Sequence, residues 1–227
     1  MVLASKNTVA EPDANAMLPE GVTMHTTRLR LVDTDPVALR QMTEDAEAAA
    51  ALLASAEVGL IVFHCTAAST IDADMGRKVA ERIERATGVP ATATSEALVA
   101  ALRALEARKI VMLSPYPQAV NDAEVAFFAH HGIEVIKEAG YLPSKGMGSP
   151  SAAPQEWYRR ALSLRTPGAD AYFLSCTNIR AVSVIDVLEK ELEAPVISSN
   201  QAMIWHCLRK GGITDAIPGY GRLLLAH

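Results

Sequence analysis

Two cysteines stand at matching places in the sequence, each after an apolar run and before a threonine. The two segments are Ile61-Val-Phe-His-Cys65-Thr66 and Ala171-Tyr-Phe-Leu-Ser-Cys176-Thr177. A thiol between a strand end and a helix start meets backbone N–H groups and a helix dipole, so we expect a lowered pKa and a nucleophilic or basic sulfur. One such cysteine is commonly a buried core residue. Two in equivalent positions favour a paired role on opposite sides of one small substrate.

A weak internal repeat relates the two halves of the chain. Residues 88–98, Gly-Val-Pro-Ala-Thr-Ala-Thr-Ser-Glu-Ala-Leu, read much like residues 193–203, Glu-Ala-Pro-Val-Ile-Ser-Ser-Asn-Gln-Ala-Met. In both halves the order is strand, Cys-Thr, helix, Pro-containing strand and a polar turn that opens another helix. Such self-similarity predicts two related α/β units. Because open α/β sheets bind ligands at the carboxyl ends of their strands, both Cys-Thr pairs are expected at a common cleft.

Short apolar runs alternate with longer helical patterns along the whole chain. We expect strands at Met1–Ser5, Thr23–Leu31, Val58–His64, Lys109–Ser114, Glu134–Glu138, Ala171–Ser175 and Pro195–Ser198. We expect helices at Pro36–Ala54, Met75–Thr87, Ser95–Ala107, Pro117–His131, Pro154–Leu164, Ala181–Glu191 and Asn200–Lys210. Almost wholly apolar strands that alternate with helices predict parallel sheets covered on both faces. The expected lobes are residues 1–92 with 196–227, and residues 93–195.

Composition narrows the classes of function. The net charge of -5 and the scattered basic residues argue against nucleic-acid binding. No apolar run approaches the roughly 20 residues of a membrane span, and no secretory signal is recognisable. The three cysteines are too far apart for a disulfide framework, so we expect a cytoplasmic protein with free thiols. Without close-spaced thiols or a phosphate-binding glycine loop, neither a metal nor a cofactor is expected.

Several motifs, in order along nearly the whole chain, resemble the aspartate/glutamate racemase superfamily. They are Ser5-Lys-Asn-Thr-Val-Ala-Glu-Pro12, the two Cys-Thr pairs, Ser114-Pro-Tyr116, Ser198-Ser-Asn-Gln-Ala202 with Trp205, and Gly219-Tyr-Gly-Arg-Leu223. Within this superfamily the chain looks most like the maleate cis-trans isomerases and arylmalonate decarboxylase. The resemblance implies an α/β fold of two pseudo-symmetric, flavodoxin-like parallel-sheet units with the active site in the cleft between them.

The resemblance also implies a role for particular residues. Cys65 would be the nucleophile and Cys176 the opposing thiol that gives or removes a proton. Asn7 and Tyr116 would donate hydrogen bonds to substrate carboxylates. The backbone amides expected to clamp the same carboxylates are those of Thr66, Ala67, Thr177 and Asn178. Orphan N–H groups at helix starts suit this task, because they bind anions without Arg or Lys.

One departure from the family pattern concerns the substrate. Maleate isomerases carry an Asp-Asn pair upstream of the helix that begins here at Pro154, and its Asn binds the second carboxylate. Counting back from Pro154, this chain has Lys145 and Gly146 there, with Ser149 nearby. The departure leaves the identity of the acid open. Asn7 and Asn200 are also candidate helix N-caps, Asn200 in particular, and Cys207 in its helical pattern is expected in the core.

Three functions fit these observations. The first is a cofactor-independent cis-trans isomerase of a small unsaturated dicarboxylate, acting through a covalent cysteine adduct. The second is a two-cysteine amino-acid racemase or an arylmalonate-type decarboxylase. The decarboxylase branch keeps only the second thiol, so the presence of Cys65 favours isomerase or racemase chemistry. The third is a non-catalytic binding protein for small carboxylates, which would need neither thiol. In each case we expect a homodimer or a higher homo-oligomer.

Overall fold

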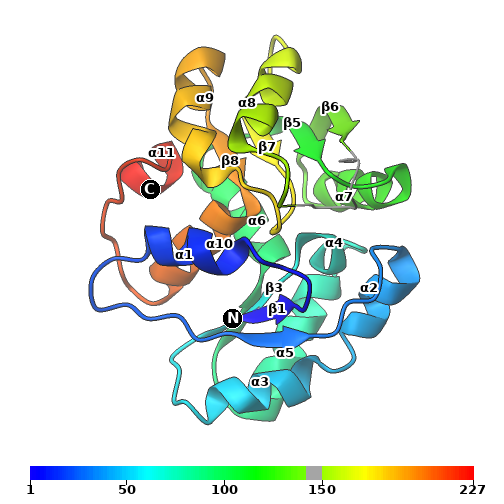
Figure 1. Ribbon diagram of the computed structural model, residues 1–227, viewed down its shortest axis with the longest axis vertical. Coiled ribbons are helices and arrows are strands. Elements are labelled where there is room, and N and C mark those ends of the chain that lie inside the picture. The colour runs from blue at the N-terminus through cyan, green and yellow to red at the C-terminus, as the bar shows by residue number, and fades with distance from the viewer. Residues whose placement is uncertain (142–149) are drawn as a thin grey trace.

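Two parallel four-stranded sheets form the framework of the computed structural model, which describes residues 1–141 and 150–227 (Figure 1). The first sheet has the order β2-β1-β3-β4, with β1 at Val2–Ala4, β2 at Thr27–Leu29, β3 at Ile61–His64 and β4 at Ala91–Ala93. The second has the order β6-β5-β7-β8, with β5 at Lys109–Ser114, β6 at Glu134–Gly140, β7 at Ala171–Leu174 and β8 at Val196–Ser198. All strand pairs are parallel. The predicted α/β fold of two pseudo-symmetric units is therefore confirmed.

The internal repeat corresponds to equivalent positions in the two sheets. Strands β3 and β7 occupy the same place in the strand order, and Cys65 and Cys176 follow them. The two repeat segments form β4 with its following helix and β8 with its following helix. Gly88 and Glu193, which begin these segments, both have a left-handed backbone, with φ of 71° and 58°. The second half thus keeps the turn geometry without the glycine that favours it.

Helices cover the sheets and fill the space between them. In the first half they are α1 Ala10–Met17, α2 Pro36–Met42, α3 Ala46–Ala54, α4 Thr66–Ser69, α5 Met75–Thr87 and α6 Thr94–Ala104. In the second half they are α7 Gln118–His130, α8 Pro154–Ser163, a 3-10 turn at Val182–Val184, α9 Ile185–Leu192, α10 Ser199–Lys210 and α11 Arg222–Ala226. Figure 1 shows α1, α6 and α10 between the two sheets, and α10 packs against both other helices. This helical layer joins the lobes.

The apolar runs in the sequence predict buried strands, and the structure confirms this. Strands β1, β3, β7 and β8 are buried at every residue, as expected for parallel strands covered on both faces. The outer strand β6 is partly exposed along its length. Several polar side chains are also buried where strands end, around the junction of the lobes. Because they are shielded from water, they need hydrogen-bond partners within the protein.

Two expectations about elements need correction. The predicted helix Pro36–Ala54 is two helices, because the Thr43 side chain bonds back to the Arg40 carbonyl and a turn follows. Helix α1 was not predicted, because its apolar pattern is weak and it contains Pro12. Pro12 lies in the first turn of the helix, where proline is tolerated. Strand β8 pairs with β7 in the second sheet, although the predicted lobe boundary falls at residue 196. The exact lobe limits stay a prediction.

Gly221, in the closing Gly-Tyr-Gly-Arg motif, offers a test of packing between α9 and the chain end. Its φ is 82°, and an added Cβ would lie 2.6 Å from Ile185 Cγ2 and 3.0 Å from Glu189 Oε1. We predict that Gly221→Ala lowers the free energy of unfolding by about 2–5 kcal/mol, from the left-handed backbone and overpacking together. Equilibrium urea denaturation measures this change.

The matched control is Gly88→Ala. Gly88 has a φ of 71° and open space where its Cβ would be added. This substitution should carry only the backbone term of about 1–2 kcal/mol. Equal losses from both substitutions would show that the contact with Ile185 does not constrain the fold.

Candidate active site

Cys65 and Cys176 occupy the ends of equivalent strands but have different backbone conformations. Cys65 is extended, with φ of -154°, and precedes the short helix α4. Cys176 has φ of 108°, a region that L residues rarely adopt. Its amide donates to Ser199 Oγ at 3.2 Å, and its Sγ accepts from the Asn178 amide at 3.3 Å. The strained conformation is thus supported on both sides of the residue.

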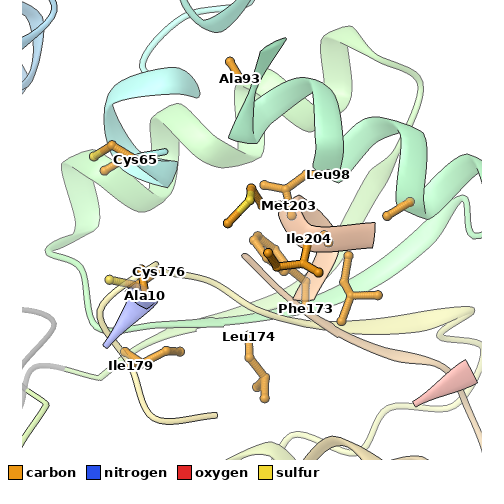
Figure 2. Close-up of a cluster of buried hydrophobic side chains, with 14 of the residues drawn as sticks. Ala10, Cys65, Ala93, Leu98, Phe173, Leu174, Cys176, Ile179, Met203 and Ile204 are labelled. Atoms are coloured by element: carbon orange, nitrogen blue, oxygen red, sulfur yellow. The ribbon is translucent and has the colours of Figure 1, made fainter. Parts of the chain in front are cut away.

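Both thiols line one small cavity between the lobes. Its volume is about 70 Å³, which suits a small molecule. The described residues that line it are Ala4, Lys6, Asn7, Leu31, Thr34, Leu39, Cys65, Ala67, Tyr116, Cys176, Thr177 and Asn178. Figure 2 shows the two cysteines beside a packed cluster that contains Leu98, Phe173 and Met203. The cysteines therefore share one cavity and do not point into separate cores.

Seven of the eight residues singled out in the sequence line this cavity, and Thr66 does not. The Thr66 hydroxyl instead donates to Ser199 Oγ at 2.7 Å, across the junction of the lobes. Asn7 follows β1 and is buried. Its Nδ2 donates to Thr177 Oγ1 at 2.8 Å, and its Oδ1 accepts from the amides that begin α1. Asn7 is therefore a helix cap whose remaining N–H can serve a ligand.

Burial has a larger effect on the pKa values of the two thiols than the helix starts that follow them. It raises the pKa of Cys65 to about 11, with the Ala68 amide acting in the opposite direction. It raises the pKa of Cys176 to about 12, although hydrogen bonds from Tyr116 and the Asn178 amide lower it. The expected lowering of the thiol pKa is wrong, because α4 has only four residues and desolvation outweighs its dipole. Both thiols are neutral in this structure at pH 7.

Tyr116 follows β5 and lies against Cys176. It is 4% exposed, and burial raises the pKa of its hydroxyl, with Cys176, Glu124 and Cys65 adding to the effect. A neutral phenol is a hydrogen-bond donor, so Tyr116 can stabilise negative charge on the Cys176 sulfur or on a ligand.

Glu124 is a buried acid beside the thiols that the sequence did not reveal. It lies on α7 with no exposed surface, and both its carboxyl oxygens are within 2.9 Å of Ser175 Oγ. Burial raises its pKa to about 8, and Glu138 adds to this rise. When ionised, Glu124 raises the pKa values of Cys65 and Cys176. In sequence it is one more charge in a helical pattern, and only the packing of α7 against β7 makes it distinctive.

A second buried polar chain lies behind Cys65. His64 Nε2 is 2.9 Å from Asn200 Oδ1, and Asn200 Nδ2 donates to Asp13 Oδ2 at 2.7 Å. His64 Nδ1 is 2.9 Å from Thr94 Oγ1. The direction of the Asn200 amide puts the His64 proton on Nε2, and burial lowers the His64 pKa to about 4.

Asn200 is therefore not the helix N-cap that the sequence suggested. Ser198 caps α10, accepting from the Gln201 amide at 3.2 Å. Cys207, expected in the core, is on α10, where it is half-buried and packs against the hydrophobic core. The Lys145, Gly146 and Ser149 positions lie outside the described residues.

No three His, Cys, Asp or Glu side chains are grouped to hold a metal ion within residues 1–141 and 150–227. None of the helices in the described part of the chain has the length and apolar character needed to cross a membrane.

Fold and site together define a class: a two-lobed α/β protein with paired thiols at one small cavity between its lobes. The chain belongs to the arylmalonate decarboxylase family, whose model matches residues 2–224. It is 26% identical to the maleate isomerase of Nocardia farcinica, over 99% of this chain and 94% of that protein. It is 32% identical to the arylmalonate decarboxylase of Bordetella bronchiseptica, over 62% of this chain and 60% of that protein.

The same likeness holds in three dimensions. A crystal structure of a Cys-to-Ala variant of the maleate isomerase Iso from Pseudomonas putida S16, with maleate, superimposes with a TM-score of 0.93. The two chains are 25% identical, and the match covers 98% of this chain and 95% of the other. The resemblance seen in the motifs is thus confirmed.

Glu124 generates a prediction about stability. Its native pKa of about 8 exceeds its ordinary value of 4.5, so the native state binds the proton more tightly than the unfolded state. Stability from this group therefore falls as pH rises from about 4.5 to 8. Wild type should lose this stability as the pH rises, and Glu124→Gln should not. We therefore predict that the free energy of unfolding of Glu124→Gln, relative to that of wild type, rises by about 3–5 kcal/mol from pH 5 to pH 8.5. Urea denaturation at both pH values measures the difference.

The exposed Glu134 provides the control, since Glu134→Gln removes a carboxyl from the protein surface. This control should show no comparable change between the two pH values. A Glu124→Gln difference that is flat with pH would mean that the buried carboxyl is not held protonated.

Proposed function

We propose that this protein is a cofactor-independent cis-trans isomerase of a small unsaturated dicarboxylate of the maleate type. The observation that carries the proposal is the pair of thiols on one cavity of about 70 Å³. The maleate isomerases to which the chain is similar over nearly its whole length support the same activity. Binding alone would need neither thiol, which argues against a non-catalytic carboxylate-binding protein.

In the proposal, neutral donors hold the first carboxylate of the substrate. The Asn7 amide and the Tyr116 hydroxyl border the cavity, with the backbone amides near Ala67, Thr177 and Asn178. Donors of this kind stabilise charge that develops on the carboxylate during addition, and burial strengthens their effect. Thr66 is left out of this set, since it does not line the cavity and its hydroxyl donates to Ser199.

The proposed reaction begins with addition of Cys65 to the double bond. Cys65 Sγ forms a bond with one alkene carbon, and the π electron pair moves to the neighbouring carbon and its carboxylate. Cys176 delivers a proton to that carbon. Cys65 releases its own proton to solvent before it attacks, and Cys176 is left as a thiolate once it has delivered its proton. The adduct therefore carries one sulfur and one hydrogen added across the double bond. Covalent catalysis thereby replaces one difficult rotation with two easier steps.

The reaction then reverses from a different rotamer. The former double bond is a single bond, about which rotation is easy. Cys176 as a thiolate removes the proton, and the electron pair of that C–H bond re-forms the alkene in the trans geometry. The C–S bond breaks, and its electron pair leaves with the Cys65 sulfur, which then regains a proton from solvent. Because Glu124 raises both thiol pKa values when it is ionised, a protonated Glu124 favours the thiolates that both directions need.

Arylmalonate-type decarboxylation is the second candidate, and the family model and the decarboxylase of Bordetella bronchiseptica favour it. In this reaction loss of carbon dioxide leaves a carbanion, which a single thiol protonates. Cys176 would suffice, and Cys65 would have no role. Two-thiol racemisation of an amino acid is the remaining alternative from the sequence. NMR of a panel of small diacids and amino acids separates isomerisation, loss of carbon dioxide and α-hydrogen exchange.

We predict that Cys65→Ser reduces turnover of maleate to fumarate by at least about a thousandfold, since the nucleophile is lost. We predict that Cys176→Ala also abolishes turnover but leaves a detectable adduct of one maleate on Cys65. Fumarate formation followed by NMR and intact-protein mass spectrometry measure the two effects.

Cys207→Ala serves as the control, because the Cys207 side chain does not line the cavity. It should keep turnover within about twofold of wild type. Turnover that survives Cys65→Ser would exclude the adduct mechanism, and carbon dioxide release from an arylmalonate in that variant would favour the second candidate.

A further inference from the structure

Lys6 contributes the one cationic side chain among the described residues that line the cavity, and no carboxyl side chain lines it with them. We propose that Lys6 binds the second anionic group of the substrate and so selects dianionic acids over their monoanionic analogues. This inference rests on the proposed function, whose neutral donors account for only one carboxylate. It assigns a specificity-determining role to a residue that the motifs alone left without one.

The backbone around Lys6 is held in place from both sides. The Ser5 amide donates to the Leu29 carbonyl at 2.7 Å, and Ser5 Oγ accepts from the Leu31 amide at 3.1 Å. On the other side, Arg28 donates to the Asn7 carbonyl at 2.7 Å. The segment after β1 is thus tied to β2 and its continuation. The backbone of Lys6 is therefore fixed beside the cavity, while its side chain is exposed.

The Lys6 ammonium has capacity for a ligand. Its Nζ donates to the Val32 carbonyl, and an ammonium carries three donors. None of the ion pairs formed by the described residues includes Lys6. The eight residues that the structure does not describe, 142–149, contain no Asp or Glu. Within residues 1–141 and 150–227, the positive charge of Lys6 therefore has no carboxylate partner at ion-pair distance.

The residues that line the cavity offer two kinds of polar group to a ligand. Near the thiols, the polar groups that border it are neutral donors, Asn7 and Tyr116 among them. Lys6 lines the same cavity together with Leu31 and Leu39. Neutral donors can hold one carboxylate, and a positive charge on the same cavity adds attraction for a second anionic group, although Lys6 is itself an exposed residue. Lys6 supplies that charge.

The test compares maleate with its monoamide, maleamate, which keeps one carboxylate and the cis double bond. In the Lys6→Met variant we expect kcat/KM for maleate to fall by about tenfold or more, and kcat/KM for maleamate to change by less than about twofold. Lys6→Arg should restore most of the selectivity. Lys190→Met, on the exposed side of α9, is the matched control and should leave both values unchanged.

Binding measured without turnover keeps this inference separate from the proposed function. Isothermal titration of each variant with succinate and with succinamate, which lack the double bond, reports the same selectivity. If wild type isomerises neither alkene, the proposed function fails. If Lys6→Met weakens diacid and monoamide equally, or weakens neither, the role of Lys6 is wrong. Selective loss of succinate affinity supports it, and a thermal unfolding scan establishes that the variant is folded.

Discussion

Burial of two thiols on either side of one small cavity is the constraint on which the rest of the site depends. Removal from water raises the pKa values of Cys65 and Cys176 to about 11 and 12, so neither is a thiolate in this structure at pH 7. The same desolvation strengthens every hydrogen bond and charge that later stabilises a thiolate or a carboxylate. Formation of a thiolate at either residue would therefore depend on a bound ligand and on the surrounding donors. The lobes must therefore bring several donors to one point.

The backbone of the two lobes is repeated, but their side chains are not. Cys65 and Cys176 follow equivalent strands, yet the residue before each has a different buried partner. His64 joins Thr94 and Asn200, whereas Ser175 joins the acid Glu124. The two thiols consequently differ in electrostatic surroundings, although their positions match. A reaction in which one sulfur adds to carbon and the other moves a proton needs such a difference.

Contacts between the lobes hold these two surroundings together. The Asn7 amide reaches Thr177, and Thr66 reaches Ser199, so each Cys-Thr pair is bonded to the opposite part of the molecule or to the helix between the lobes. Because Ser199 also accepts from the Cys176 amide, one hydroxyl links both cysteine turns. Strain at Cys176, with φ of 108°, is retained by this network. Movement of one lobe against the other would change the distance between the two sulfurs.

The sequence alone determined the two-unit α/β architecture, because apolar strands, the repeat and the paired Cys-Thr motifs are local patterns that survive without coordinates. It also pointed to the two cysteines from their repeated motifs, and to Asn7 and Tyr116 through the resemblance to a known family. Tertiary structure decided the rest. Burial reversed the expected direction of the thiol pKa shifts, turned the Thr66 hydroxyl toward Ser199, and gave Asn200 a partner in His64. Glu124 and Lys6 are ordinary charges in the sequence, since the burial of Glu124 and the place of Lys6 on the cavity arise only when distant segments pack together.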